Sequence, residues 1–216
     1  MQKLLRKGFV GATFHEAVTK PPARKTLAIT FDDAYLSVLE LAQPILEGLG
    51  LPATVFVPTD FPDAPGQAMK WQGIDGWLGG EYDSELRPMS WQQLGGLADR
   101  GWEIGSHTRS HPHLTQLDQL DLEAELTGSR EVCEQRLGRP CRTIAYPYGD
   151  YDARVAAAAG AAGYEAAAAL PSRLTPQRSL EWPRVGIYHE DDDRRFALKV
   201  SRPMRRLRGS VLWPRA

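Results

Sequence analysis

The chain has 216 residues, of which 42% are hydrophobic and 25% charged, and its formal net charge is −1. This composition is typical of an ordinary globular protein and excludes a disordered or fibrous chain. The length favours a single domain over residues 1–216, because two separate cores usually need roughly 100 to 150 residues each.

Charge is distributed unevenly along the chain. Residues 1–25 carry six basic residues and one acidic residue, and the segment from Arg194 to the end carries eight basic residues and no acidic one, which leaves an acidic middle. An acidic body argues against nucleic acid as a partner, because phosphate binding needs clustered Lys and Arg. The basic C-terminal tail from about 194 fits a solvated helix; contact with anionic lipid or polymer is the alternative, and we assign the tail no function.

No apolar run approaches the roughly 18 residues of a membrane helix. The apolar stretch Gly8–Phe14 behind the first basic residues is too short for a secretory signal, so we expect a cytoplasmic protein unless a leader has been removed. Cys133 and Cys141 match no disulfide framework and no zinc or redox pattern, which predicts buried free thiols. The oligomeric state does not follow from the sequence.

In chain order, the first half predicts alternating strands and helices. The expected elements are a strand at Thr26–Phe31, a helix at Tyr35–Leu49, a strand at Ala53–Val57, a helix at Ser90–Arg100 and a strand at Trp102–Ser106. Between Pro58 and Pro88 lies a long loop rich in Gly, Pro and Asp that holds Trp71 and Trp77. A loop of this length inside a domain is usually functional or mobile.

The second half continues the alternation. A helix is expected to begin near Thr115 as its N-cap, followed by a strand at Arg142–Tyr146, a helix at Asp152–Ala162 capped by Gly163, a last strand at Arg184–Tyr188, and a helical tail from Asp192 that Pro203 interrupts. Repeating β/α units suggest an α/β barrel, in which functional residues follow the carboxyl ends of the strands.

Three predicted strands end in unusual polar residues: Thr30-Phe31-Asp32-Asp33, Ser106-His107-Thr108-Arg109-Ser110-His111-Pro112 and Ala145-Tyr146-Pro147-Tyr148-Gly149. Two His and one carboxylate form a facial ligand set for a divalent metal and leave coordination positions open. The spacing of His107 and His111 is that of the HExxH zinc proteases, but Thr108 replaces the required Glu and Pro112 precedes the predicted helix. A zinc protease is therefore excluded.

Asp32 and Asp33 share one site only if the backbone bends between them, because adjacent strand residues point to opposite faces. One carboxylate then ligates the metal while the other accepts a proton from water. The alternative is that Asp33 only caps the following helix, where Asp is common.

Together these motifs resemble the polysaccharide deacetylases with the NodB homology domain, carbohydrate esterase family 4. Two further segments are similar to that family: Leu51-Pro52-Ala53-Thr54-Val55-Phe56-Val57 and Gly101-Trp102-Glu103-Ile104-Gly105. The resemblance covers roughly residues 25 to 190. It implies a distorted (β/α) barrel and a metal-dependent hydrolase that removes acetyl groups, mostly N-acetyl, from an amino-sugar glycan or glycoside.

The resemblance also implies roles for individual residues. Asp32 resembles the catalytic base, while Asp33, His107 and His111 resemble the ligands of one divalent ion, with zinc the expected metal. The backbone N–H of Tyr148 resembles the oxyanion donor. A general base and an oxyanion donor suit the hydrolysis of an acetamide, which is a poor electrophile.

The chain departs from the family pattern in two places. Ala145 stands where the family has the Arg that orients the base, and the late motif that supplies the general acid is not evident. His15, after an apolar run, and His189, after the last predicted strand, are candidates for that acid, although each also fits a surface histidine.

Two alternatives to the deacetylase stay open. The departures from the family pattern are compatible with a degenerate, non-catalytic glycan-binding domain. A non-haem iron oxygenase uses the same ligand set, but usually in β-rich barrels. The substrate itself is not determined: chitin oligomers, peptidoglycan, a β-1,6-linked glucosamine polymer, an O-acetylated glycan and a small glycoside all fit. Trp71 and Trp77 in the long loop either stack on sugars or anchor the loop.

Overall fold

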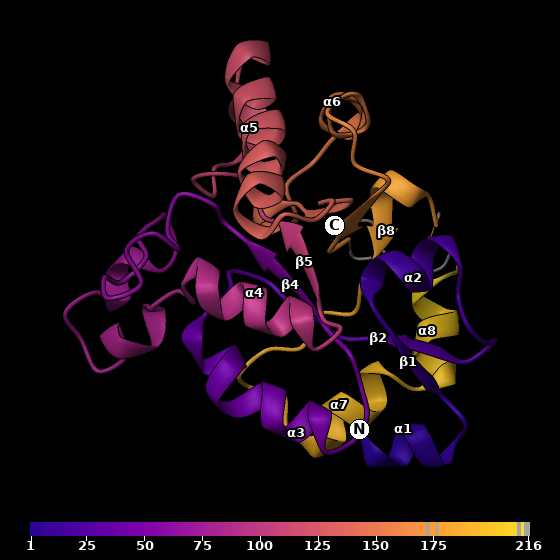
Figure 1. Ribbon diagram of the computed structural model, residues 1–216. Coiled ribbons are helices and arrows are strands. Elements are labelled where there is room, and N and C mark those ends of the chain that lie inside the picture. Colours follow the sequence, from indigo (N-terminus) through magenta and orange to yellow (C-terminus); the bar gives the residue numbers. More distant parts are fainter. Residues whose placement is uncertain (172, 176, 211–212, 214–216) are drawn as a thin grey trace.

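Six short parallel strands, in the order β3-β4-β5-β6-β7-β8, form the main sheet, which curls into a half-barrel with helices outside it (Figure 1). This computed structural model describes residues 1–171, 173–175, 177–210 and 213, so part of the basic tail, residues 211–212 and 214–216, lies outside the described residues. The strands are β3 (Thr30–Phe31), β4 (Thr54–Val57), β5 (Glu103–Ser106), β6 (Thr143–Ala145), β7 (Ala166–Ala169) and β8 (Trp182–Pro183). The expected distorted (β/α) barrel is confirmed.

A second, two-stranded sheet extends the first strand of the barrel at its amino end. Strand β1 (Val10–Ala12) pairs in parallel with β2 (Thr26–Ala28), and β2 is separated from β3 only by Ile29. The predicted strand Thr26–Phe31 is therefore one extended segment that pairs with β1 in its first half and with β4 in its second half.

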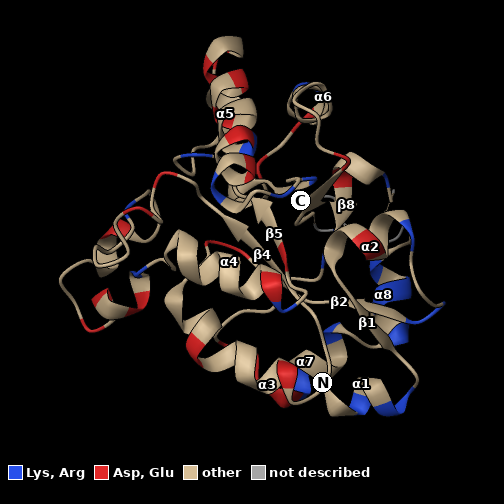
Figure 2. Ribbon diagram, viewed as in Figure 1, with Lys and Arg blue, Asp and Glu red and all other residues tan. Residues whose placement is uncertain are grey.

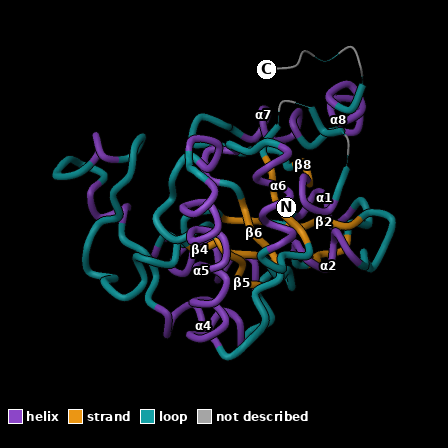
Figure 3. Tube along the Cα trace, turned by 90° about the horizontal axis from the view of Figure 1, so that it is seen from above, coloured by secondary structure: helices purple, strands orange, loops and turns teal. Residues whose placement is uncertain are grey.

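The helices surround the strands, as the view from above shows (Figure 3). They are α1 (Gln2–Arg6), α2 (Phe14–Thr19), α3 (Gln43–Glu47), α4 (Trp91–Asp99), α5 (Gln119–Leu137), α6 (Ala153–Ala161), α7 (Asp193–Lys199) and α8 (Arg202–Arg208). A π-helical turn at Val38–Ala42 precedes α3, and short 3₁₀ turns lie at Asp75–Trp77, Asp83–Leu86, Leu114–Gln116, Pro147–Gly149 and Ser179–Glu181. None of the described helices is long and apolar enough to cross a membrane.

Four sequence predictions are wrong in detail. The helix predicted at Tyr35–Leu49 is not one regular α-helix, because a π-helical turn at Val38–Ala42 precedes the short α3 at Gln43–Glu47. Asp118, not Thr115, is the N-cap of α5, because its side chain accepts a hydrogen bond from the Asp121 N–H. Arg184–Tyr188 is not a strand. Pro203 does not interrupt a helix but is the second residue of α8, in the first turn, where the missing N–H of proline costs no hydrogen bond.

Small residues let the barrel interior close tightly. All four alanines of β7 are fully buried, because helices cover one face of the strand and the barrel interior the other. At Gly105 a Cβ atom would lie 2.6 Å from Thr143 Oγ1 and 2.7 Å from the Phe56 ring. Glu103 makes polar contacts between neighbouring strands, accepting hydrogen bonds from Thr54 Oγ1 (2.8 Å) and Thr143 Oγ1 (2.5 Å).

Helix α2 closes the amino end of the barrel. The Phe14 N–H donates to Thr54 Oγ1 at 2.8 Å, the His15 N–H donates to Glu103 Oε2 at 2.9 Å, and the Phe14 ring packs edge-on against Phe56. Thr54 and Glu103 are the first residues of β4 and β5, so these contacts lie at the amino ends of the strands. The carboxyl ends form the open side.

The long loop between β4 and α4 has a small core of its own and projects to one side of the barrel (Figures 1 and 3). Met69, Trp71, Ile74 and Leu86 pack together in this core, and the Met69 N–H donates to the Leu86 carbonyl. The loop is therefore an ordered structure beside the carboxyl ends of the strands.

Candidate functional site

Asp33, His107 and His111 converge at the carboxyl end of the sheet. Asp33 Oδ1 lies 3.3 Å from Nε2 of His107 and 3.3 Å from Nε2 of His111, and the three candidate ligand atoms all lie within 4.8 Å of one another. Both imidazoles are buried, with 2% and 5% of the side chains exposed. The predicted facial set is thus assembled from β3 and from the loop after β5.

Left-handed backbone conformations bring these residues together. Among the described residues, five that are not glycine have a positive φ: Asp33 (68°), Ala34 (54°), Thr108 (67°), His111 (64°) and Tyr148 (60°). All five belong to the segments that follow β3, β5 and β6 and carry the three motifs. Such conformations cost of order 1–3 kcal/mol each and persist where the surrounding structure enforces them, which is typical of functional sites. The bend required for Asp32 and Asp33 to share one site is therefore present.

The donor set fits a divalent cation. His107 Nδ1 donates to the Ala145 carbonyl oxygen at 2.8 Å, and this hydrogen bond leaves the lone pair of Nε2 facing Asp33. Asp33 Oδ1 is buried and, within the described part of the chain, has no hydrogen-bond donor. Two imidazole nitrogens and one carboxylate oxygen match the ligands that zinc takes in catalytic sites. Asp33, His107 and His111 therefore form a credible metal site by their own chemistry.

Electrostatics favours the ionised form of Asp33. Burial raises the pKa of Asp33, but the adjacent imidazoles of His107 and His111 outweigh this effect and hold the pKa well below its usual range. The carboxylate therefore carries its negative charge at neutral pH, as metal ligation requires.

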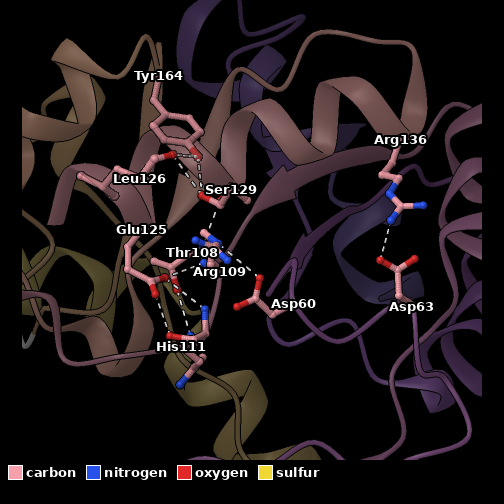
Figure 4. A network of polar contacts seen from close by, with 12 residues as sticks. Asp60, Asp63, Thr108, Arg109, His111, Glu125, Leu126, Ser129, Arg136 and Tyr164 are labelled. Atoms are coloured by element: carbon pink, nitrogen blue, oxygen red, sulfur yellow. Dashed lines mark hydrogen bonds and ion pairs between the residues drawn. The ribbon is translucent and has the colours of Figure 1, made fainter. Parts of the chain in front are cut away.

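Glu125 of α5 holds the loop that carries both histidines (Figure 4). Its Oε2 accepts hydrogen bonds from the backbone N–H groups of Arg109 (2.7 Å) and Ser110 (3.0 Å), and its Oε1 accepts one from Ser110 Oγ (2.7 Å). The His111 N–H donates to Thr108 Oγ1 at 3.1 Å. Sequence reasoning missed Glu125, since no motif marks a residue on the outer helix that acts through backbone contacts.

Asp32 is held by an arginine that the sequence motifs did not reveal. Arg184, directly after β8, donates from Nη1 to Asp32 Oδ1 (2.6 Å) and from Nη2 to Asp32 Oδ2 (2.8 Å), and its Nη1 also donates to Thr30 Oγ1 (3.0 Å). The chain has Ala145 at the position where the family has an arginine. Asp32 nevertheless has an arginine partner, which follows β8. The sequence analysis expects Arg184 at the start of a strand, whereas it directly follows the end of β8. A position just after a strand is where functional residues of such barrels lie, and this is the signal that marks Arg184.

This ion pair sets the protonation of Asp32. Burial raises the pKa of the carboxyl group, but the charge and hydrogen bonds of Arg184 outweigh that effect and lower the pKa below its usual range. The carboxyl group of Asp32 is therefore ionised at neutral pH, and its orientation is fixed by a planar, bidentate partner.

Tyr148 lies beside the metal ligands. Its ring centroid lies 4.6 Å from that of His111 and 4.0 Å from that of His113, which stacks on it, while its hydroxyl donates to the Gln72 carbonyl in the long loop. His113 faces Asp150 at 3.5 Å, and Thr115 donates to the same carboxylate. The backbone of Tyr148 is thus fixed close to the site, while its role as oxyanion donor stays a prediction.

The two candidate general acids lie in different places. His15 Nε2 lies 2.7 Å from Glu165 Oε2 at the amino ends of the strands, where α2 closes the barrel, so His15 is on the wrong side to reach Asp33. His189 is exposed in the turn after Tyr188. Its role stays a prediction.

The two loop tryptophans differ in exposure. Trp71 is 9% exposed and stacks on His111 with 4.3 Å between the ring centroids, so it anchors the long loop to a metal ligand. Trp77 is 52% exposed, which leaves its face available to a sugar.

Comparisons with known proteins agree with this geometry. Residues 19–167 match the family model described as polysaccharide deacetylase. YxkH of Bacillus subtilis, which is assigned to the polysaccharide deacetylases, is 27% identical over 146 residues, covering 68% of this chain and 45% of YxkH. Chitin deacetylase 1 of Cryptococcus neoformans is 43% identical over 63 residues, covering 29% of this chain and 13% of that protein. The chain thus spans less than half the length of either relative.

Solved structures show the same fold. The deacetylase PplD of Streptococcus pyogenes, solved in complex with acetate, superposes with a TM-score of 0.74 at 20% identity, covering 93% of this chain and 83% of PplD. The polysaccharide deacetylase BC0361 of Bacillus cereus superposes with a TM-score of 0.73 at 24% identity, covering 93% of this chain and 59% of BC0361. The family match spans the motifs of Asp32, His107 and Tyr148, and the chain belongs to the polysaccharide deacetylase family.

Proposed function

We propose that this domain is a metal-dependent N-deacetylase of an amino-sugar glycan or glycoside. The observation that carries the proposal is the convergence of Asp33, His107 and His111 beside Asp32, which Arg184 holds ionised. A ligand set and an adjacent, oriented carboxylate are the two parts that metal-assisted hydrolysis requires. Family membership supports an acetylated carbohydrate as substrate.

Each side chain has a stated task in this mechanism. A divalent cation at the three ligands, zinc by the chemistry of the donor set, would polarise the acetyl carbonyl and acidify water. Asp32 accepts the proton of the attacking water on its carboxylate, and Arg184 keeps the carboxylate in place as the proton arrives. The Tyr148 N–H donates to the oxygen that gains negative charge, a donor whose loss typically costs on the order of a hundredfold in rate.

The departing amine has to be protonated by a group at the carboxyl ends of the strands. His15 does not meet this requirement, because it belongs to α2 and contacts Glu103 and Glu165 at the amino ends of the strands. We infer that the proton acquired by Asp32 returns to the departing amine, because Asp32 lies beside the candidate metal ligand Asp33 at the carboxyl ends of the strands.

Neither alternative function has a specific observation in its favour. The hypothesis of a non-catalytic glycan-binding domain rests on Ala145 and on the missing motif for the general acid. Arg184 removes the first reason, because it supplies the arginine partner of Asp32. A non-haem iron oxygenase shares the ligand set, but membership of the polysaccharide deacetylase family argues against it.

Acetate release from N-acetylglucosamine oligomers tests the proposal, with an O-acetylated glycan as the comparison substrate. We expect release from the N-acetylated oligomers, loss by a factor of about 10² to 10⁴ in Asp32→Asn, and unchanged metal content in that variant. Asp63→Asn is a matched control, since Asp63 pairs with Arg136 on the surface. Wild-type activity in Asp32→Asn would overturn the assigned base, and release from the O-acetylated glycan alone would overturn N-acetyl specificity.

A further inference from the structure

A cleft lies at the opposite end of the strands from the Asp33, His107 and His111 cluster. It has a volume of about 1220 Å³ and lies between α1, the carboxyl end of α3, α7 and the start of α8. Phe9, Lys25 and Leu49 on its walls stand shortly before β1, β2 and β4. The cleft therefore faces the amino ends of these strands, whereas the candidate metal ligands follow carboxyl ends.

The cleft is strongly basic. Helix α1 and its end contribute Lys3, Arg6 and Lys7. The other walls contribute Arg24, Lys25, Arg202 and Arg205. All seven side chains are exposed, and Asp193 is the single acidic residue among the described residues that line the cleft. Figure 2 shows the Lys and Arg residues gathered on α1 and α8.

These charges are not neutralised within the protein. None of the seven basic residues forms an ion pair with a carboxylate in the part of the chain that the structure describes, whereas Arg109, Arg136 and Arg142 elsewhere each pair with one. Lys25 Nζ donates instead to the Lys7 carbonyl at 2.7 Å, which keeps two cationic segments side by side. Clustered positive charge without counter-charges favours an anionic ligand.

Apolar surface accompanies the basic residues. Leu4 is buried in the cleft wall, and Phe9, Phe196 and Val200 are half-buried there. At the edge, Ile45 is 62% exposed, and Leu41 one turn earlier is 65% exposed. Basic residues beside exposed aliphatic side chains are typical of surfaces that lie on the headgroup region of a bilayer.

We propose that this cleft binds the phosphate-bearing headgroup of an anionic membrane lipid, so that the protein docks on the membrane surface through α1, α3 and α8. An anionic lipid offers both a phosphate for the seven cations and acyl chains for the apolar edge. Nucleic acid and anionic polysaccharide are polar along their length, so they match the cations but leave the exposed Ile45 and Leu41 without a partner.

Docking in this way orients the candidate active site. The cleft and the metal ligands lie at opposite ends of the strands, so the open side of the barrel points away from the bilayer. The acyl chains stay with the membrane while Asp32 and Asp33 face the aqueous phase.

Co-sedimentation with vesicles tests the inference. We expect the protein to bind vesicles of phosphatidylcholine containing phosphatidylglycerol at least about tenfold more strongly than vesicles of phosphatidylcholine alone, with binding that weakens as salt is added. The double variants Lys3→Glu with Arg6→Glu, and Arg202→Glu with Arg205→Glu, are each expected to lose this preference. Ile45→Ser, which removes the aliphatic side chain without adding a charge, is expected to weaken binding without a large change in its salt dependence.

A matched control separates the cleft from overall charge. Lys20→Glu with Lys70→Glu changes the net charge by the same amount at exposed positions outside the cleft and is expected to bind like the wild type. Three results would each overturn the inference. The first is an equal loss of vesicle binding in the control and cleft variants, the second is equal binding to both kinds of vesicle, and the third is binding to dextran sulfate with none to vesicles. Acetate release from soluble oligomers is expected to be unchanged in the cleft variants, which shows that they are folded.

Discussion

Arg184 and Asp32 form a bidentate ion pair although 152 residues separate them in the chain. Its two hydrogen bonds, 2.6 and 2.8 Å long, fix both carboxylate oxygens, and the guanidinium also lies 5.5 Å from the centre of the Phe56 ring. The carboxylate of the proposed base, Asp32, is therefore held in place by the residue that directly follows β8, the last strand of the barrel.

Replacing Arg184 tests this arrangement. Arg184→Met is expected to lower kcat by about 10²-fold, because the base loses its fixed position, while metal content stays unchanged. Arg184 lowers the pKa of Asp32 and burial raises it, so without the arginine the pKa rises and the base becomes protonated at higher pH. The acid limb of the kcat profile should move to higher pH. Arg184→Lys keeps the charge but not the bidentate geometry. Its kcat and the acid limb of its pH profile should lie between those of the wild type and those of Arg184→Met. An unchanged pH profile in Arg184→Met would count against the pair.

Metal binding should stabilise the fold through the histidines. At a zinc concentration of about 100 times Kd, binding contributes about 2.7 kcal/mol to the free energy of unfolding. For a domain of this size that raises Tm by about 5–10 °C. His111→Ala should bind little zinc and show no such rise, and a chelator should reverse the rise in the wild type. His189→Ala is the control, since this exposed residue is not among the ligands. Equal zinc-dependent shifts in both variants would contradict the assignment.

Glu125 should affect metal affinity from outside the ligand set. Glu125→Ala removes the acceptor for the N–H groups of Arg109 and Ser110, so the loop between the two histidines loses its anchor. Loss of such a supporting residue typically weakens metal affinity by about 10- to 100-fold. Glu123→Ala on the same helix, whose carboxylate only accepts from Gln119, should leave zinc affinity unchanged in a titration. Similar affinities in the two variants would show that Glu125 has no part in holding the loop.

Gly105 and Gly95 should respond in opposite ways to alanine. At Gly105 the added methyl group overlaps Phe56 and Thr143, and overpacking of this kind costs about 1–3 kcal/mol. At Gly95, inside α4, a methyl group meets nothing within 4 Å, and the better helix propensity of alanine should add up to about 1 kcal/mol. Urea denaturation measures both free energies of unfolding. A Gly105→Ala protein as stable as the wild type would contradict the tight closure of the interior.

The parts of the fold that followed from the sequence are those governed by local patterns. β-Branched and aromatic runs predicted β4, β5 and β6 to within about two residues, and Ser90 was a correct boundary because its side chain caps α4. The strand β8 escaped prediction because it has two residues, Trp182 and Pro183, while the more β-prone segment after it is not a strand.

The candidate site followed from the sequence only as far as its contiguous motifs. Asp33, His107 and His111 were predicted together from the ends of two strands, β3 and β5, and the structure assembles them. The partners that orient the site, Glu125 and Arg184, depend on how distant elements pack, and no local signal records that. The cytoplasmic localisation and the single-domain organisation stay predictions.

Helix α2 closes the barrel from below, with Phe14 only 2% exposed and its N–H bonded to the first residue of β4. A substrate of the proposed reaction would therefore have to approach Asp32 from the carboxyl ends of the strands. Acetate released there would leave on the same side, so product release and the next binding event would share the face beside the loop that Trp71 ties to His111.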